Sequence, residues 1–404
     1  MKEEILDNGI KLIYKEIKGN ISSFSIAFDA GANQETKEEI GLAHLVEHVL
    51  FKGTTSKSEL EINVLCDKYF GFNNAMTNFP YAMYYGTTLN EDFEKAVELY
   101  GDILINPLLK EEGFKEEVNI ILEELKEWID DSDLYLEDVL FKNSFSNRRI
   151  KERIIGTEAY LKNFKIEDVR RFYEEYYTSK NCCIAVVSSI PYETVKAVVG
   201  NCLRGMALED EKESEVLYNI NKPHIYKEEN SKLKIGRIEY IFPIDALSYE
   251  ELAILHIFNT SFGEGVSSLL FDRVRTKKGL AYEIYSQIKV EKGIKLFIIR
   301  ANTSKENIDK VISIIDECIE ASKLGLFSSQ EIIEGAIKKY QIRMEIKQEK
   351  SIEMAKFLAT NHIMFKESIP DFYNISQRII TTVDIERVIS KLFNNPIIQI
   401  LSNN

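Results

Sequence analysis

Apolar residues recur with helical spacing in the segment 41–50. On a helix they share one side, and they are Leu42, Leu45, Val46, Val49 and Leu50. The polar residues His44, Glu47 and His48 fall on the opposite side. The pattern therefore predicts a helix that packs through one face and presents three ionisable side chains on the other.

A second helix is predicted over 111–130 by an apolar stripe at the same period. The stripe consists of Phe114, Val118, Ile121, Leu122, Leu125 and Ile129. Three acidic residues lie on the far side, where solvent is expected, namely Glu116, Glu123 and Glu127. Glu117 and Glu124, two turns apart, flank the stripe instead and can face inward. Each could also form an ordinary salt bridge at the rim of the core.

One pattern occurs twice along the chain. Residues 84–104 and 296–319 each read as a strand, a short polar turn and an amphipathic helix, at an offset of 215 residues (309 − 94). Upstream of each copy, 23–30 and 238–243 read as strands rich in β-branched and aromatic residues. We expect an α+β fold made of two homologous α/β halves in tandem, each an antiparallel-rich sheet packed with helices.

The boundaries of these halves follow from a change of composition. Residues 208–233 are charged, poor in apolar runs and contain Pro223, which predicts a linker. The halves are then 1–207 and 234–404. Only the first half carries the two closely spaced histidines, so the chemistry is expected there.

Composition narrows the class of protein. The formal charge of −14 argues against a nucleic-acid partner, because phosphate contacts need a positive surface. The sequence has no apolar run long enough for a membrane span and no secretory signal at its N-terminus. Its five cysteines show no CxxC spacing, so neither a disulfide framework nor a cysteine metal site is predicted. We expect a cytoplasmic protein.

His44 and His48 give the most specific chemical signal. Residues four apart on a helix lie one above the other, so both imidazoles can bind one metal ion. With Glu47 they form HxxEH, the inverse of the HExxH zinc-protease pattern. A metal-activated water and a carboxylate base together indicate peptide-bond hydrolysis. The alternative is a solvated polar helix face. A zinc site also needs a third ligand, and the spacing leaves Glu117 and Glu124 both open.

The segment 41–54, GLAHLVEHVLFKGT, resembles the zinc helix of the pitrilysin/insulinase family of inverted-zincin metallopeptidases. The chain looks most like the short bacterial members that are similar to mitochondrial processing peptidase. In this family the third ligand is a glutamate about 76 residues after the second histidine, which corresponds to Glu124. The resemblance implies one Zn²⁺ per chain bound by His44, His48 and Glu124. It also implies Glu47 as the base and Glu117 as a supporting acid.

Two further motifs extend the resemblance along the chain. Asn74, Ala75, Met76 and Thr77 resemble the family's NAxT edge strand, and Arg275 and Tyr282 resemble its R-x6-Y pair. The edge strand would pair with an extended peptide, and the Arg/Tyr pair would reach the substrate backbone. The alternatives are an ordinary turn and strand, and a salt-bridging arginine beside a packed tyrosine.

From the two-half layout we expect a clamshell in which the halves enclose peptides or unfolded segments and exclude folded proteins. The expected activity is that of a zinc-dependent endopeptidase. A homodimer is expected, with a separate partner subunit as the alternative. A competing interpretation is a non-catalytic or partner-dependent subunit of a peptide-processing complex. The presence of all three ligand residues and the base favours the enzyme.

Overall fold

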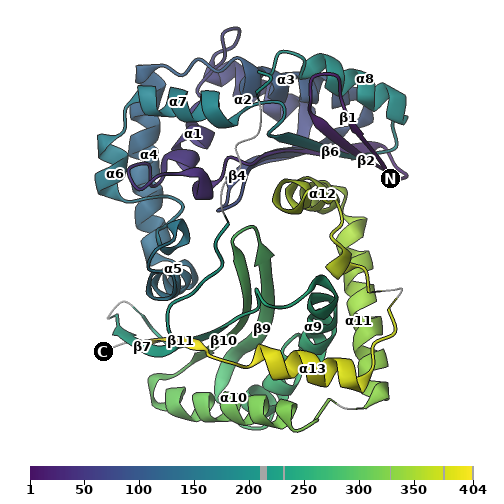
Figure 1. Ribbon diagram of the computed structural model, residues 1–404. Coiled ribbons are helices and arrows are strands. Elements are labelled where there is room, and N and C mark those ends of the chain that lie inside the picture. The colour runs from purple at the N-terminus through teal and green to yellow at the C-terminus, as the bar shows by residue number, and fades with distance from the viewer. Residues whose placement is uncertain (210–215, 231–232, 328, 376–377, 403–404) are drawn as a thin grey trace. The chain divides into compact units, whose positions relative to one another are not determined.

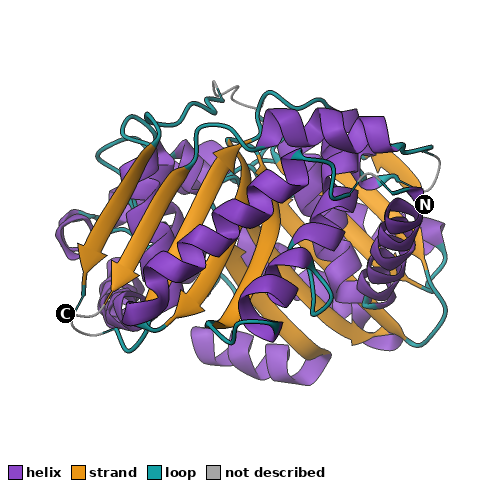
Figure 2. Cartoon of the chain, turned by 90° about the horizontal axis from the view of Figure 1, so that it is seen from below, coloured by secondary structure: helices purple, strands orange, loops and turns teal. Residues whose placement is uncertain are grey.

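The computed structural model describes residues 1–209, 216–230, 233–327, 329–375 and 378–402. The chain forms two compact units (Figure 1). Unit 1 comprises Met1–Trp128, Glu152–Glu215 and Lys347–Ile369, and unit 2 comprises Ile129–Lys151, Val216–Ile346 and Pro370–Asn404. The α+β class predicted from the sequence is confirmed, since helices pack on a mixed sheet in each unit (Figure 2).

The sheet of unit 1 has the strand order β1-β2-β6-β3-β5-β4. Its strands are β1 (Lys2–Ile5), β2 (Lys11–Glu16), β3 (Ile21–Phe28), β4 (Phe70–Thr77), β5 (Ala82–Leu89) and β6 (Cys182–Ser188). Neighbouring strands are antiparallel except for β2 and β6, which are parallel.

Helices cover both faces of this sheet. They are α1 (Leu42–Leu50), α2 (Glu59–Tyr69), α3 (Phe93–Ile105), α4 (Glu111–Asp130), α6 (Glu158–Asn163), α7 (Ile166–Tyr176), α8 (Tyr192–Cys202) and α12 (Ser351–Phe365). Figure 1 shows α12 on the opposite face of the sheet from α1, α3 and α8. The larger core lies between the sheet and the helices on the same face as α1, where Phe24, Tyr84 and Tyr100 are fully buried.

Unit 2 contains a five-stranded sheet with the order β7-β11-β8-β10-β9. Its strands are β7 (His224–Glu229), β8 (Gly236–Pro243), β9 (Ala281–Glu291), β10 (Ile294–Thr303) and β11 (Ile397–Ser402). Its helices are α5 (Ser132–Ser144), α9 (Tyr249–Phe262), α10 (Ile308–Lys323), α11 (Gln330–Glu349, which runs on into unit 1), α13 (Thr382–Leu392) and the π-helix Phe271–Thr276.

The internal repeat is confirmed at the level of topology. The order β2-β6-β3-β5-β4 of unit 1 corresponds strand for strand to β7-β11-β8-β10-β9 of unit 2, and each sheet has its one parallel pair at the same place. The two repeat copies are β5 followed by α3 and β10 followed by α10, each joined by a short 3-10 turn. This correspondence supports the prediction of two similar halves.

The compact units are not the contiguous halves predicted from the sequence. The helix α5 comes from the first half of the chain but packs in unit 2, and α12 comes from the second half but packs in unit 1. Met354, Leu358 and Ile363 of α12 pack on apolar residues of β2, β3 and β6. Neither helix gathers its apolar residues strongly on one face, so hydropathy does not say which sheet each one covers.

The predicted linker 208–233 also needs correction. It contains β7, which pairs in parallel with β11 at the edge of the second sheet. Edge strands are often charged and partly exposed, and β7, with the sequence HIYKEE, has no buried residue. That composition explains why the segment resembles a linker. Residues 210–215 and 231–232 of the predicted linker lie outside the described residues.

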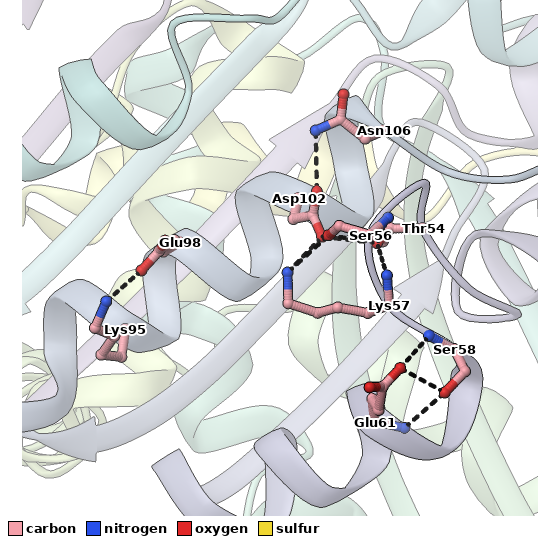
Figure 3. A network of polar contacts seen from close by, with 9 residues as sticks. All are labelled: Thr54, Ser56, Lys57, Ser58, Glu61, Lys95, Glu98, Asp102 and Asn106. Carbon is pink, nitrogen blue, oxygen red and sulfur yellow. Dashed lines mark hydrogen bonds and ion pairs between the residues drawn. The ribbon is translucent and has the colours of Figure 1, made fainter.

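A polar network fixes the loop between α1 and α2 to helix α3 (Figure 3). The Asp102 carboxylate accepts hydrogen bonds from Thr54 Oγ1 at 2.7 Å, Ser56 Oγ at 2.9 Å and Lys57 Nζ at 2.8 Å. Burial alone would raise the pKa of Asp102, but these donors outweigh it and lower the pKa to about 2. The Asp102 carboxylate is therefore an anchor for the loop that follows α1.

Replacing Asp102 by alanine is expected to lower the free energy of unfolding by about 2 kcal/mol, since a partly buried charged acceptor loses several donors at once. Because its pKa is lower in the folded chain, this contribution is complete above about pH 4 and is lost as the pH falls towards 2. Urea unfolding at pH 7 and pH 3 measures both effects. The matched control is Glu98→Ala, one turn earlier on α3, whose ion pair with Lys95 is exposed (Figure 3). That change is expected to cost under about 0.5 kcal/mol, and an equal cost for both variants would contradict the prediction.

Candidate metal centre

The helix α1 is fixed at its first turn by close backbone packing and by one buried carboxylate. Gly41, its N-cap, has a φ of 98°, and a Cβ at this position would stand 2.9 Å from the Cα of Gly156. The Glu35 carboxylate accepts the backbone N–H groups of Gly41 at 3.0 Å and Ala43 at 2.9 Å. A carboxylate here satisfies backbone N–H groups that have no partner within the helix, and its negative charge is attracted by the positive end of the helix dipole.

His44 and His48 project together from the polar side of α1, as the sequence predicts. Their ring centroids are 4.6 Å apart. The His44 and His48 side chains are only 11% and 23% exposed, and Leu42 and Leu45 on the opposite side of the helix are fully buried as well. This degree of burial contradicts the alternative of a solvated helix face.

Glu124 on α4 completes a group of three donors. Its carboxylate oxygens lie 3.8 Å from His44 Nε2 and 3.6 Å from His48 Nε2. Two ligands at zinc distances and a tetrahedral angle would stand roughly 3.4 Å apart. Within the described parts of the chain, these residues form the one group of three or more His, Cys, Asp or Glu side chains that converge closely enough to bind a metal ion.

Glu117, two turns before Glu124, has a different place. Its Oε2 lies 2.9 Å from His48 Nδ1, and its side chain is only 8% exposed. Burial raises the pKa of Glu117, but the hydrogen bond and charge of His48 outweigh it, so the pKa lies below its usual value. Because the ionised carboxylate only accepts, Nδ1 carries the proton and Nε2 is left to face Glu124.

The donor set fits a zinc ion. Burial, with a smaller effect from His48, lowers the pKa of His44 to about 3, so this ring is the neutral form that a metal requires. Burial raises the pKa of Glu124, and a bound cation would oppose this effect. Two imidazoles and one carboxylate form a ligand set typical of catalytic zinc sites.

Glu47 lies on the same helix face, between the two histidines in sequence. Glu47 is 8% exposed, and its carboxylate accepts a hydrogen bond of 2.7 Å from Thr77 Oγ1. Burial raises the pKa of Glu47, and the Thr77 hydrogen bond only partly opposes this effect. A carboxylate with a raised pKa, fixed by one donor, is suited to accept a proton near neutral pH.

Thr77 is also the last residue of β4, the edge strand of the first sheet. β4 pairs with β5 on one side and ends the sheet on the other. Along β4, Ala75 packs against the core, whereas Asn74 and Met76 are exposed. The four residues from Asn74 to Thr77 therefore stand on a sheet edge, the position that the family resemblance implies.

Arg275 and Tyr282 belong to unit 2. Arg275 is the penultimate residue of the π-helix Phe271–Thr276, and Tyr282 is the second residue of β9. The Arg275 guanidinium carbon lies 5.1 Å from the Tyr282 ring centroid, and the tyrosine is 82% exposed. The structure thus brings these two side chains together and leaves the Tyr282 ring open to solvent.

The family assignment rests on models that match both halves of the chain. The model described as "Insulinase (Peptidase family M16)" matches residues 11–158, which include all the candidate metal ligands. The model described as "Peptidase M16 inactive domain" matches residues 163–340. The chain belongs to the M16 peptidase family. The description of the second model agrees with the absence of an HxxEH pattern from the second half of this M16 member.

Relatives with printed names extend the comparison. An uncharacterized zinc protease of Bacillus subtilis, YmxG, is 27% identical over 343 residues, 82% of this chain and 81% of the relative. The zinc protease PqqE of Helicobacter pylori is 24% identical over 343 residues, 81% of this chain and 76% of that protein. Such names support membership of this M16 chain in a family of zinc peptidases.

Solved structures of low sequence identity share the M16 fold. A protease from Helicobacter pylori has a TM-score of 0.88 at 21% identity, covering 99% of both chains. An M16 inactive-domain protein from Pseudomonas fluorescens has a TM-score of 0.83 at 17% identity, covering 100% of this chain and 98% of that one.

Among the described residues, none of the helices is both long and apolar enough to span a membrane.

Two residues around this M16 site were not predicted from the sequence. Glu35 caps α1 from a loop, and Lys52 lies between α1 and α4 beside Glu117. Each is a charged residue that belongs to no spacing pattern with the histidines, so the sequence alone gives no signal for it. The one available cue is that Lys52 falls inside the family-like segment 41–54.

Proposed function

We propose that the chain is a zinc-dependent endopeptidase that hydrolyses oligopeptides or unfolded leader-like segments. The observation that carries the proposal is the convergence of His44, His48 and Glu124 beside the buried carboxylate Glu47. His44 and His48 would hold the ion from α1, and Glu124 would hold it from α4. One zinc ion per chain bound there would polarise the scissile carbonyl and make water a stronger acid.

Glu47 acts as the general base of the reaction. It removes a proton from the attacking water and later gives it to the leaving amine. Thr77, which donates to Glu47 Oε2, fixes the carboxylate so that its other oxygen can face the water. Glu117 holds the proton of His48 on Nδ1 and thereby orients that ring.

The peptide is held by backbone pairing along Asn74–Thr77. An edge strand offers unpaired N–H and C=O groups, which bind an extended chain with little dependence on its sequence. Because Thr77 belongs to this edge strand and also donates to Glu47, a peptide paired with β4 is positioned next to the base. Unfolded segments can adopt this extended form, whereas the backbone N–H and C=O groups of a folded protein already have hydrogen-bond partners.

Incubating the purified protein with a mixed peptide pool, with and without a chelator, tests the proposal. The expected result is internal cleavage that stops when zinc is removed and returns when zinc is added back. Mapping the cuts by mass spectrometry also shows which side chains are preferred. Cleavage that resists the chelator, or no cleavage by a protein that binds zinc, would contradict the proposed activity.

We further propose that Arg275 and Tyr282 contact the substrate backbone and that the chain acts as a homodimer.

Arg275→Ala is expected to lower kcat/KM for peptides by about tenfold, the effect of losing one charged hydrogen bond, without changing zinc content. Arg273→Ala, an exposed arginine of the same π-helix, is the matched control. Equal activity of both variants and wild type would remove Arg275 from substrate binding. Sedimentation analysis tests the dimer, and activity that appears only with a second protein would favour the partner-dependent alternative.

A further inference from the structure

Lys52 follows the metal-ligand helix α1 by two residues and is largely buried. Its side chain is 11% exposed, and its Nζ lies 2.7 Å from Glu59, 3.1 Å from Glu116 and 3.3 Å from Glu117. A single ammonium group therefore meets three carboxylates from two helices. Such a group can offset repulsion between acids that would otherwise move apart.

The path of the Lys52 side chain explains a glycine within the first turn of α4. A Cβ at Gly113 would stand 2.9 Å from Lys52 Cβ and 3.2 Å from its Cγ. Glycine inside a helix costs about 1 kcal/mol relative to alanine. The open position at Gly113 lets the lysine stem cross α4 at close range, so that its ammonium reaches the acids one turn further on.

The contact with Glu117 connects Lys52 to the metal site. Glu117 uses Oε1 for Lys52 Nζ and Oε2 for His48 Nδ1, so the two oxygens have different partners. A carboxylate held at both oxygens has little freedom to rotate. Without the lysine, Glu117 would keep only its bond to His48, while the charge of Glu124 two turns further on repels it.

We propose that Lys52 is a positioning residue of the metal centre, which holds Glu117 so that His48 keeps the orientation needed to bind zinc. This inference rests on the proposed function, because it requires zinc at His44, His48 and Glu124. Lys52 touches neither the substrate nor the reacting atoms. It acts through its contact with Glu117, which it reaches from the segment that follows α1.

The test is the affinity of the metal-free protein for zinc alone, measured by competition with a colorimetric chelator. Lys52→Met is expected to raise the Kd for zinc by up to about tenfold, less than the 10–100-fold that loss of the ligand's direct partner Glu117 typically causes. Lys52→Arg keeps the charge and is expected to restore at least part of this loss. Lys57→Met is the matched control. This variant also loses a lysine ion pair, the one between Lys57 and Asp102 on α3, and that pair does not involve Glu117.

A double variant shows whether Lys52 acts through Glu117. Glu117→Gln combined with Lys52→Met is expected to bind zinc no more weakly than Glu117→Gln alone, since residues of one network are not additive. Additive losses would overturn the proposed route. Unchanged zinc affinity of Lys52→Met would overturn the role of Lys52 and leave the proposed function intact. A wild-type protein without zinc affinity would contradict the proposed function itself.

Gly113→Ala keeps the inference testable if Lys52→Met does not fold. The added methyl group displaces the lysine stem but leaves its charge, so a smaller rise in the Kd for zinc is expected. Gly200→Ala on α8 is the control, because its Cβ would meet nothing within 4 Å. Equal zinc affinity of the two alanine variants would count against the proposal.

Discussion

Replacing Glu47 by glutamine is expected to lower kcat for peptide cleavage by roughly 10²–10⁴-fold, the contribution of a positioned general base. Zinc content should stay at the wild-type level, because Glu47 is not one of the three converging donors. Glutamine has nearly the same shape and can still accept the hydrogen bond from Thr77. The change therefore removes the base and leaves its surroundings in place. Single-turnover cleavage of one mapped peptide, together with zinc analysis, measures both quantities.

The control for this variant is Glu123→Gln. Glu123 lies on α4, one residue before Glu124, but its side chain is 72% exposed and paired with Lys126. Its loss is expected to change neither zinc content nor kcat. If Glu47→Gln retains full turnover, proton transfer must pass through another group, and Glu47 has no place in the mechanism.

Replacing His44 by alanine is expected to abolish both stable zinc binding and activity. The variant loses one of three protein ligands, so the fall in zinc affinity should exceed the 10–100-fold cost of losing an outer partner. Zinc at 100 times its Kd stabilises a folded protein by about 2.7 kcal/mol. The wild type should show this gain in thermal unfolding, and the His44→Ala variant should show none at the same zinc concentration.

His224→Ala is the matched histidine control. His224 is exposed on the edge strand β7 of unit 2 and belongs to no group of converging donors among the described residues. Its zinc-dependent stabilisation should equal that of the wild type. A His44→Ala variant that still gains the full stabilisation would place the zinc elsewhere.

Short-range patterns predict much of the local geometry around the candidate site. The helical period of 41–50 placed His44, Glu47 and His48 on one face, and the stripe of 111–130 separated the inward acids from the solvated ones. The exposed fractions of 60% at Glu116 and 8% at Glu117 agree with that separation. The choice of Glu124 over Glu117 as a ligand was outside the reach of periodicity, because both flank the same stripe. It needed the family spacing, and the distances agree with it.

Long-range packing was less predictable. The helix α12 binds the first sheet through small and apolar side chains such as Ala355 and Leu358, and α5 lies in unit 2 with an ion pair of 2.6 Å between Glu137 and Lys289. Nothing local in either helix identifies its partner sheet. The same holds for Glu35, whose capping bonds depend on where a loop brings its carboxylate.

The most direct test of the central claim is to locate the metal in active protein prepared without chelator. Elemental analysis should give one zinc per chain, and anomalous diffraction at the zinc edge should place that ion within bonding distance of His44 Nε2, His48 Nε2 and the Glu124 carboxylate. Active protein with no metal between these three side chains, or with Glu124 turned away from the histidine pair, would contradict it.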